Sequence, residues 1–285
     1  MPPVVNTPHR ALHDLQWAVS HNSYESDQQY TKNDQPFPVG QFYEQGFRGI
    51  ELDINRDVDH MQTPEWCVNH GVGFSDDYKL LSTYLADICS WCQGKPQHDL
   101  VVVHLDCKDV DVNEGFPGDL DAYLLRGLGG QQVYRPGDLL RPGSDLVQSA
   151  MASGWHALAE LTGRVMFILT GETRPKANYA RTDPTNRLCF ADLDIDFAFA
   201  VDAGTRIIAN DDAAIDHPGF DYGQWSAGQR GLLWRSYTAV DAPTFTTLAS
   251  RGANMVAAEA ASFTPPDGGG YWLNPKAGAV PGALA

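Results

Sequence analysis

Eight short apolar runs, separated by longer segments of mixed polarity, are the feature of this sequence that most restricts its fold. The runs are rich in Val, Ile and Leu, as in parallel strands that are covered on both faces. Eight such strands favour a closed barrel over an open doubly wound sheet. The predicted strands span residues 17–20, 49–54, 100–105, 165–170, 188–193, 206–209, 231–234 and 253–257.

Helices are expected in the segments between these runs. The predicted helices span residues 39–45, 77–91, 119–125, 145–161 and 242–250. Ser144 is a candidate N-cap for the fourth helix. Pro243 suits the first turn of the fifth helix, which Gly252 ends. Strands and helices thus alternate along the chain, which predicts an α/β fold of the TIM-type (β/α)8 barrel class with some irregularity.

The chain is expected to form one domain over residues 1–285. Its length would suit two domains of about 150 residues, but single α/β barrels commonly reach this size. No internal repeat is evident, and no linker divides the sequence. The Gly- and Pro-rich tail, about residues 265–285, is expected to be irregular, with Tyr271 and Trp272 as candidate anchors.

The charge balance excludes several classes of partner. Acidic side chains outnumber basic ones by 36 to 20, which gives a formal net charge of −16. Such a surface repels polyanions, which argues against a nucleic-acid-binding protein and against tight electrostatic docking to anionic lipid. No apolar run approaches the roughly 18 residues of a transmembrane helix, and no secretory signal is visible near the start.

Five cysteines leave at least one thiol unpaired in a monomer. We favour a disulfide from Cys67 to either Cys89 or Cys92, with buried thiols as the alternative. A zinc site is poorly supported, because no second close pair of Cys or His residues has matching spacing.

Polar side chains are dense where the first three predicted strands end. The first strand runs into His21 and Asn22, and the third ends at Asp106. Glu51 and Asp53 share a face of the second strand, because side chains alternate along a strand. In a barrel these strand ends converge at one face. Three carboxylates and an amide make an all-oxygen set suited to calcium, or to magnesium with tighter octahedral geometry.

Three linked motifs carry a family resemblance. They are SHNSY at residues 20–24, GFRGIELD at residues 46–53 and VNHG at residues 68–71. Their order and spacing, with 49 positions between the two histidines, resemble the catalytic half of the phosphatidylinositol-specific phospholipases C. The resemblance covers about residues 15–110, and the remainder matches only as a barrel-like pattern.

The second motif separates two branches of that family. Metal-independent members place an arginine two residues after the aspartate of the second strand, in place of the metal. Here that position is Asn55, whereas Asn22 and Glu51 offer oxygen atoms. Arg56 is adjacent, but alternation directs its side chain to the opposite face. The sequence therefore resembles the calcium-dependent branch.

The resemblance also implies roles for individual residues. The implied calcium ligands are Asn22, Glu51, Asp53 and Asp106, with Mg²⁺ as the alternative ion. His21 is expected beside the phosphorus, and His70 is expected to protonate the leaving oxygen. The sequence does not assign the general base, and the candidates are Glu51, Asp53 and the first histidine, His21.

Candidate contacts to the substrate phosphate or headgroup are Lys108, Arg235 and Tyr237. Arg235 is equally compatible with a surface salt bridge. Residues 210–212 are expected to form a solvated turn. His104 receives no role, and the surface is expected to hold His60, His98, His156 and His217.

The sequence thus predicts a calcium-dependent phosphodiesterase that cleaves phosphatidylinositol-type lipids to diacylglycerol and a (cyclic) inositol phosphate. The alternatives are a glycerophosphodiester phosphodiesterase, a sphingomyelinase D-like enzyme or a non-catalytic lipid- or phosphate-binding barrel. The expected partner is a phospholipid or small phosphodiester, with transient contact to a membrane surface and no nucleic acid. We expect a secreted or extracytoplasmic protein, and its oligomeric state stays open.

Overall fold

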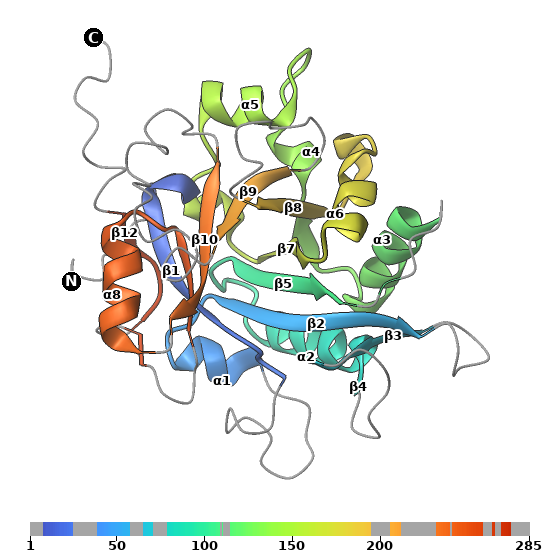
Figure 1. Ribbon diagram of the computed structural model, residues 1–285, viewed down its shortest axis with the longest axis horizontal. Helices are drawn as coiled ribbons and strands as arrows, with labels where there is room; N and C mark the ends of the chain where they lie inside the picture. Colours follow the sequence, from blue (N-terminus) through green and yellow to red (C-terminus); the bar gives the residue numbers. More distant parts are fainter. Residues whose placement is uncertain are drawn as a thin grey trace.

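Eight parallel strands form the ring at the centre of the computed structural model (Figure 1). The structure describes residues 8–24, 39–57, 65–70, 79–108, 110, 115–194, 206–211, 232–239, 241–258, 264–265 and 269–274. In order around the ring, the strands are β1 (Leu15–Ser20), β2 (Gly49–Asp57), β5 (Val101–Cys107), β7 (Arg164–Gly171), β8 (Cys189–Asp194), β9 (Arg206–Asp211), β10 (Leu233–Ala239) and β11 (Met255–Ala258). Each of them corresponds to one of the predicted apolar runs.

Strand β1 closes the ring because it pairs in parallel with both β11 and β2. The contact with β2 is short, matching only Val19 with Gly49 and Ser20 with Ile50. A side chain at Gly49 would lie 2.8 Å from a methyl carbon of Val19, so the two strands approach closely only because glycine stands there. The predicted α/β barrel is therefore confirmed, with irregular closure.

Shorter strands extend the sheet outside the ring. β3 (Glu65–Val68) pairs antiparallel with β2, β4 (Lys79–Leu80) pairs antiparallel with β3, and β6 (Gln132–Tyr134) runs parallel to β7. β12 (Trp272–Leu273) pairs antiparallel with β1. The prediction of an irregular tail is thus wrong for residues 272–273. The cause is burial of the two aromatic anchors, and the Tyr271 hydroxyl donates to the carbonyl oxygen of Leu100 at 2.9 Å.

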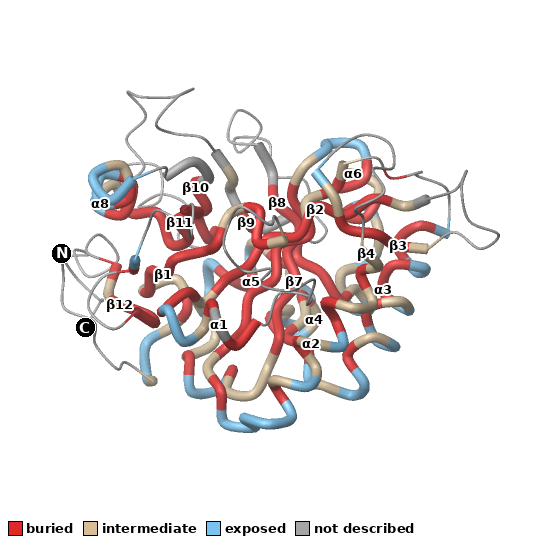
Figure 2. Tube along the Cα trace, turned by 90° about the horizontal axis from the view of Figure 1, so that it is seen from below, coloured by how far each residue is buried: buried red, intermediate tan, exposed pale blue. Residues whose placement is uncertain are grey.

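Helices lie around the strand ring, and buried residues gather in the strands (Figure 2). The α-helices are α1 (Val39–Glu44), α2 (Leu81–Gly94), α3 (Phe116–Gly127), α4 (Pro136–Leu139), α5 (Leu146–Ser153), α6 (Thr173–Ala180) and α8 (Ala242–Ser250). The 3₁₀ helices are η1 (Leu12–Asp14), η3 (Leu158–Leu161) and η4 (Pro184–Asn186). Within the described part of the chain, no helix has the length and apolar character needed to cross a membrane.

Two predicted helices differ from the observed ones. The helix predicted over residues 145–161 stops at its C-cap, Gly154, which has a φ of 72°. A Cβ atom at this position would lie 2.7 Å from the His13 ring. Residues 158–161 then form the separate 3₁₀ helix η3. The helix predicted over residues 77–91 begins at Leu81, because residues 79–80 pair with β3.

The predicted disulfide is wrong, because none of the five cysteines, all of which the structure describes, forms a disulfide. The Cys67 thiol faces the carbonyl oxygen of Asn55 at 3.5 Å, and Cys92 is buried in the core beneath α2. The surface assignment of His98 is also wrong. Its ring is buried and lies 2.6 Å from the carbonyl oxygen of Asp99. His60 and His217 lie outside the described residues.

The N-cap of α5 provides a test of the local structure. Asp145 accepts a hydrogen bond from the backbone N–H of Gln148 at 2.7 Å, so Asp145 caps the helix and the predicted cap, Ser144, does not. We expect Asp145→Ala to lower the free energy of unfolding by about 1 kcal/mol. Ser144→Ala should change it by less than about 0.5 kcal/mol. Urea denaturation followed by circular dichroism measures both, and equal losses would contradict this assignment.

Candidate metal centre and active site

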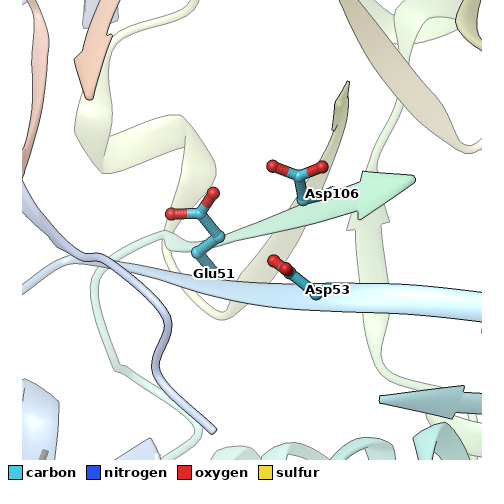
Figure 3. A group of neighbouring side chains, drawn as sticks. All are labelled: Glu51, Asp53 and Asp106. Atoms are coloured by element: carbon cyan, nitrogen blue, oxygen red, sulfur yellow. The ribbon is translucent and has the colours of Figure 1, made fainter. Parts of the chain in front are cut away.

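Three carboxylates from β2 and β5 meet beside the end of β5 (Figure 3): Glu51 and Asp53 lie within β2, and Asp106 is the next-to-last residue of β5. Asp53 and Asp106 are register partners on these adjacent parallel strands, so their side chains leave the sheet on the same face. Glu51 lies two residues before Asp53 and shares that face. One oxygen from each of the three groups lies within 4.8 Å of the others. Glu51 and Asp53 are almost completely buried.

Burial and mutual repulsion disfavour negative charge in this cluster. Burial, with the charges of Asp106 and Glu51, raises the pKa of Asp53 to about 7. Burial and the Glu51 charge raise the pKa of Asp106 to about 6. Burial also opposes ionisation of Glu51, but Arg235 and then His21 hold its pKa below the usual value. Excess negative charge on buried hard-oxygen donors fits a divalent cation, and the donor type fits calcium or magnesium.

The turn after β1 is joined to β2 beside Glu51. The Ser23 hydroxyl donates to the carbonyl oxygen of Ser20 at 2.8 Å and accepts the backbone N–H of Glu51 at 3.0 Å. The Ser23 N–H donates back to the Glu51 carbonyl at 3.0 Å. These bonds hold the preceding residues, His21 and Asn22, at the mouth of the barrel. Asn22 is buried and has a φ of 44°.

His70 is exposed and lies two residues after β3, the strand that pairs antiparallel with β2. The segment before it is anchored by Asn55, whose amide donates to the carbonyl oxygen and the side-chain oxygen of Asn69 at 3.0 and 2.6 Å. The Asn69 N–H donates to the Asp53 carbonyl at 3.1 Å. Sequence reasoning noticed Asn55 only as a position without arginine and missed this anchoring contact.

Arg56 lies outside the site, as side-chain alternation predicts. Its guanidinium pairs with Asp119 on α3 at 3.2 Å and lies over the Trp66 ring. Arg56 therefore does not take the place of the metal ion.

Two basic side chains contact the carboxylates directly. The Lys108 ammonium lies 3.2 Å from Oδ2 of Asp53 and 3.3 Å from Oδ1 of Asp106. The Arg235 guanidinium lies 2.8 Å from Oε2 of Glu51. Arg235 is only 1% exposed, so the alternative of a surface salt bridge is wrong. The backbone of Tyr237 belongs to β10, and its side chain lies outside what the structure describes.

A partly buried polar chain continues from Arg235 on β10 to the neighbouring strands β9 and β8. Arg235 donates to Oδ1 of Asn210 at 3.2 Å, and the Asn210 amide donates to Oδ2 of Asp192 at 2.6 Å. The ammonium of Lys176, on α6, pairs with Oδ1 of Asp192 at 2.5 Å. The predicted solvated turn at residues 210–212 is wrong for the first two residues, because β9 continues to Asp211.

His104 is a second residue that sequence reasoning left without a role. It is the register partner of Glu51 and lies two residues before Asp106, so it shares the inner face of the barrel. Burial and the Arg235 charge hold its pKa well below the usual value, which keeps the ring neutral. The sequence offered a signal for this position: His104 and Asp106 are two residues apart on one strand, so their side chains share a face.

The comparisons with known proteins agree with this geometry. Residues 40–200 match the family model described as Phosphoinositide phospholipase C, Ca2+-dependent. No curated protein matches the chain in sequence.

Solved structures share the fold. A calcium-dependent phosphoinositol-specific phospholipase C from a Pseudomonas species is 17% identical with a TM-score of 0.75, covering 95% of this chain and 98% of that one. The Streptomyces antibioticus calcium-dependent enzyme is 17% identical with a TM-score of 0.70, covering 87% and 94%. A glycerophosphodiester phosphodiesterase from Parabacteroides distasonis is more distant, at 11% identity and a TM-score of 0.53, covering 86% and 92%.

Gly171 offers a test of how the backbone shapes this site. Its φ is 83°, and a side chain there would overlap Oδ1 of Asp106 and the carbonyl oxygen of Cys107. We expect Gly171→Ala to displace the Asp106 carboxylate and to weaken calcium binding about tenfold or more. Isothermal titration calorimetry with calcium measures this.

Gly130 provides the matched control for Gly171. It has a similar φ of 96° but open space around it. Gly130→Ala should therefore incur the same left-handed backbone strain, about 1–2 kcal/mol, and leave calcium affinity unchanged. Equal calcium affinities for the two variants would contradict the proposed contact with Asp106.

Proposed function

The chain belongs to the calcium-dependent phosphoinositide phospholipase C family and is a phosphodiesterase, and we propose that it cleaves phosphatidylinositol-type lipids to diacylglycerol and a cyclic inositol phosphate. The observation that carries this proposal is the convergence of Glu51, Asp53 and Asp106 at the barrel mouth. Calcium, when bound, supplies positive charge for a phosphate oxygen and for the neighbouring inositol hydroxyl. We assign its ligands to these three carboxylates and the Asn22 amide oxygen.

The nucleophile in this proposal belongs to the substrate. The inositol 2-hydroxyl is adjacent to the phosphate, so its attack is intramolecular and pre-positioned. Glu51 or Asp53 accepts the proton of that hydroxyl as the new phosphorus–oxygen bond forms. The charge of His21 acts on Glu51, which supports a position for this imidazole beside the reacting phosphate.

His70 is assigned as the general acid. In its imidazolium form it donates a proton to the diacylglycerol oxygen as the phosphorus–oxygen bond to that group breaks. The exposure of His70 supports this role, because the ring can regain a proton from solvent. Water can then open the cyclic product with the same groups in reversed roles.

The substrate and the metal suggest where the protein acts. A lipid substrate requires transient contact with a membrane surface. Extracellular calcium sites typically have dissociation constants of about 10⁻⁴–10⁻³ M, weaker than cytosolic buffers. Lys108 and Arg235 already offset part of the carboxylate charge, which supports a weak site. We therefore infer a secreted or extracytoplasmic enzyme.

Product analysis tests the function. We expect phosphatidylinositol vesicles to yield an inositol phosphate in calcium and no product in excess chelator. The same assay with glycerophosphodiesters and sphingomyelin tests the two alternative enzyme classes. Release of glycerol phosphate or choline, rather than inositol phosphate, would contradict the phospholipase C proposal.

Asp53→Asn tests the metal ligands. Loss of one anionic ligand should weaken calcium binding about tenfold or more while the circular dichroism spectrum stays unchanged. Asp241→Asn is the matched control, because Asp241 is an exposed aspartate that caps α8 and asparagine caps equally well. Normal calcium affinity and turnover in Asp53→Asn would refute the ligand assignment.

The leaving group tests the role of His70. His70→Ala should lower turnover on a glycerolipid by about 10²–10⁴-fold. A nitrophenyl substrate has an acidic leaving group that needs little protonation, so the variant should cleave it much better. His21→Ala should lose both activities, because charge develops at phosphorus in either case. His9→Ala, at an exposed histidine, is the control. Equal losses on both substrates for His70→Ala would exclude its assignment as acid.

A further inference from the structure

Lys108 contacts the same carboxylates that we assign to calcium. Its ammonium lies 3.2 Å from Asp53 and 3.3 Å from Asp106, so it bridges the two strands that carry the cluster. The Lys108 backbone N–H donates to the carbonyl oxygen of Ile54 at 3.1 Å, which fixes the base of the side chain beside β2. The side chain itself is 30% exposed.

Arg235 differs from Lys108 in how firmly it is held. It is 1% exposed, forms an ion pair with Glu51 and donates a hydrogen bond to Asn210, which in turn donates to Asp192. Moving this guanidinium would leave several buried polar groups without partners. The Lys108 ammonium can instead move from the carboxylates into solvent, because a flexible four-carbon stem carries it at the edge of the site.

Charge balance also indicates that the Lys108 ammonium, and not the Arg235 guanidinium, leaves the carboxylates when calcium binds. Three carboxylates, one guanidinium and one divalent cation are together neutral. An ammonium that remained among them would add an excess positive charge in a poorly solvated site, where repulsion between cations is strong. Lys108 and calcium therefore exclude each other from Asp53 and Asp106.

We propose that Lys108 is a tethered counter-ion that competes with calcium for Asp53 and Asp106, and that its displacement sets the calcium affinity of the site. The inference rests on the proposed metal centre and deepens it. It differs from the role that the family resemblance implies for Lys108, a contact to the substrate phosphate or headgroup. The two roles differ in a measurement that contains no substrate.

Calcium titration of the full chain by calorimetry, without lipid, tests this proposal. Lys108→Met removes the competing ammonium and should tighten calcium binding about tenfold or more, because the ion no longer has to displace a cation paired with two carboxylates. Lys108→Gln should act in the same direction. Lys108→Arg keeps the positive charge and should stay nearer to the wild type.

Lys95→Met is the matched control. Lys95 is 51% exposed and pairs only loosely, at 3.6 Å, with Glu44. Lys95→Met and Lys108→Met change the net charge of the protein by the same amount, so a general electrostatic effect would appear in both variants. We expect its calcium affinity to stay within about twofold of the wild type.

Thermal unfolding supplies a second readout. In chelator, Lys108→Met should melt at a lower temperature than Lys95→Met, because its carboxylates lose a counter-ion. Calcium should then raise its melting temperature by more than it raises that of the wild type.

Each outcome of these measurements has a clear meaning. Unchanged or weaker calcium binding by both Lys108→Met and Lys108→Gln overturns the competition. Unchanged calcium binding together with a raised Michaelis constant for phosphatidylinositol, measured in a separate turnover assay, would assign Lys108 to the substrate instead. Absence of calcium binding by the wild type overturns the metal centre itself, which separates failure of the proposed function from failure of this inference.

Discussion

Negative charge buried on two adjacent strands, β2 and β5, is the constraint on which the rest of the site depends. Glu51, Asp53 and Asp106 lie close together where water is scarce, so each charge needs a partner. Arg235 supplies a buried partner and Lys108 a partly exposed one. Removing one member of a buried pair costs about 3–5 kcal/mol, because the other charge is left uncompensated. The charges of the three carboxylates are thus partly balanced by two basic side chains, and a bound divalent cation would change that balance.

The fold meets this constraint with a few precise backbone contacts. The register of β2 and β5 brings Asp53 beside Asp106. Hydrogen bonds between Ser23 and Glu51 join the turn that carries His21 to β2. Asn55 anchors the segment that precedes His70. Catalytic groups placed on strand ends and short turns are held within small tolerances, which favours pre-organised chemistry.

Local patterns were sufficient to predict the strands and the acidic cluster. The apolar runs located all eight barrel strands, because a strand buried on both faces must be apolar along its length. Alternation placed Glu51 with Asp53 and directed Arg56 away. The same patterns failed where distant contacts decide the outcome. Gly154 ended a predicted helix against His13, and Asn210 proved to be a strand residue bonded to Arg235.

Residue type and spacing along the chain were enough to predict the fold class, the family and the clustering of three carboxylates. The pairing of charges, in contrast, follows from the three-dimensional arrangement of the strands. The contacts of Arg235 with Glu51 and of Lys108 with Asp53 depend on how the ring closes and on the register between strands. The partly buried chain through Asn210 depends on the same closure. Electrostatic pairing acts through space over a few ångströms, and distance along the chain does not predict it.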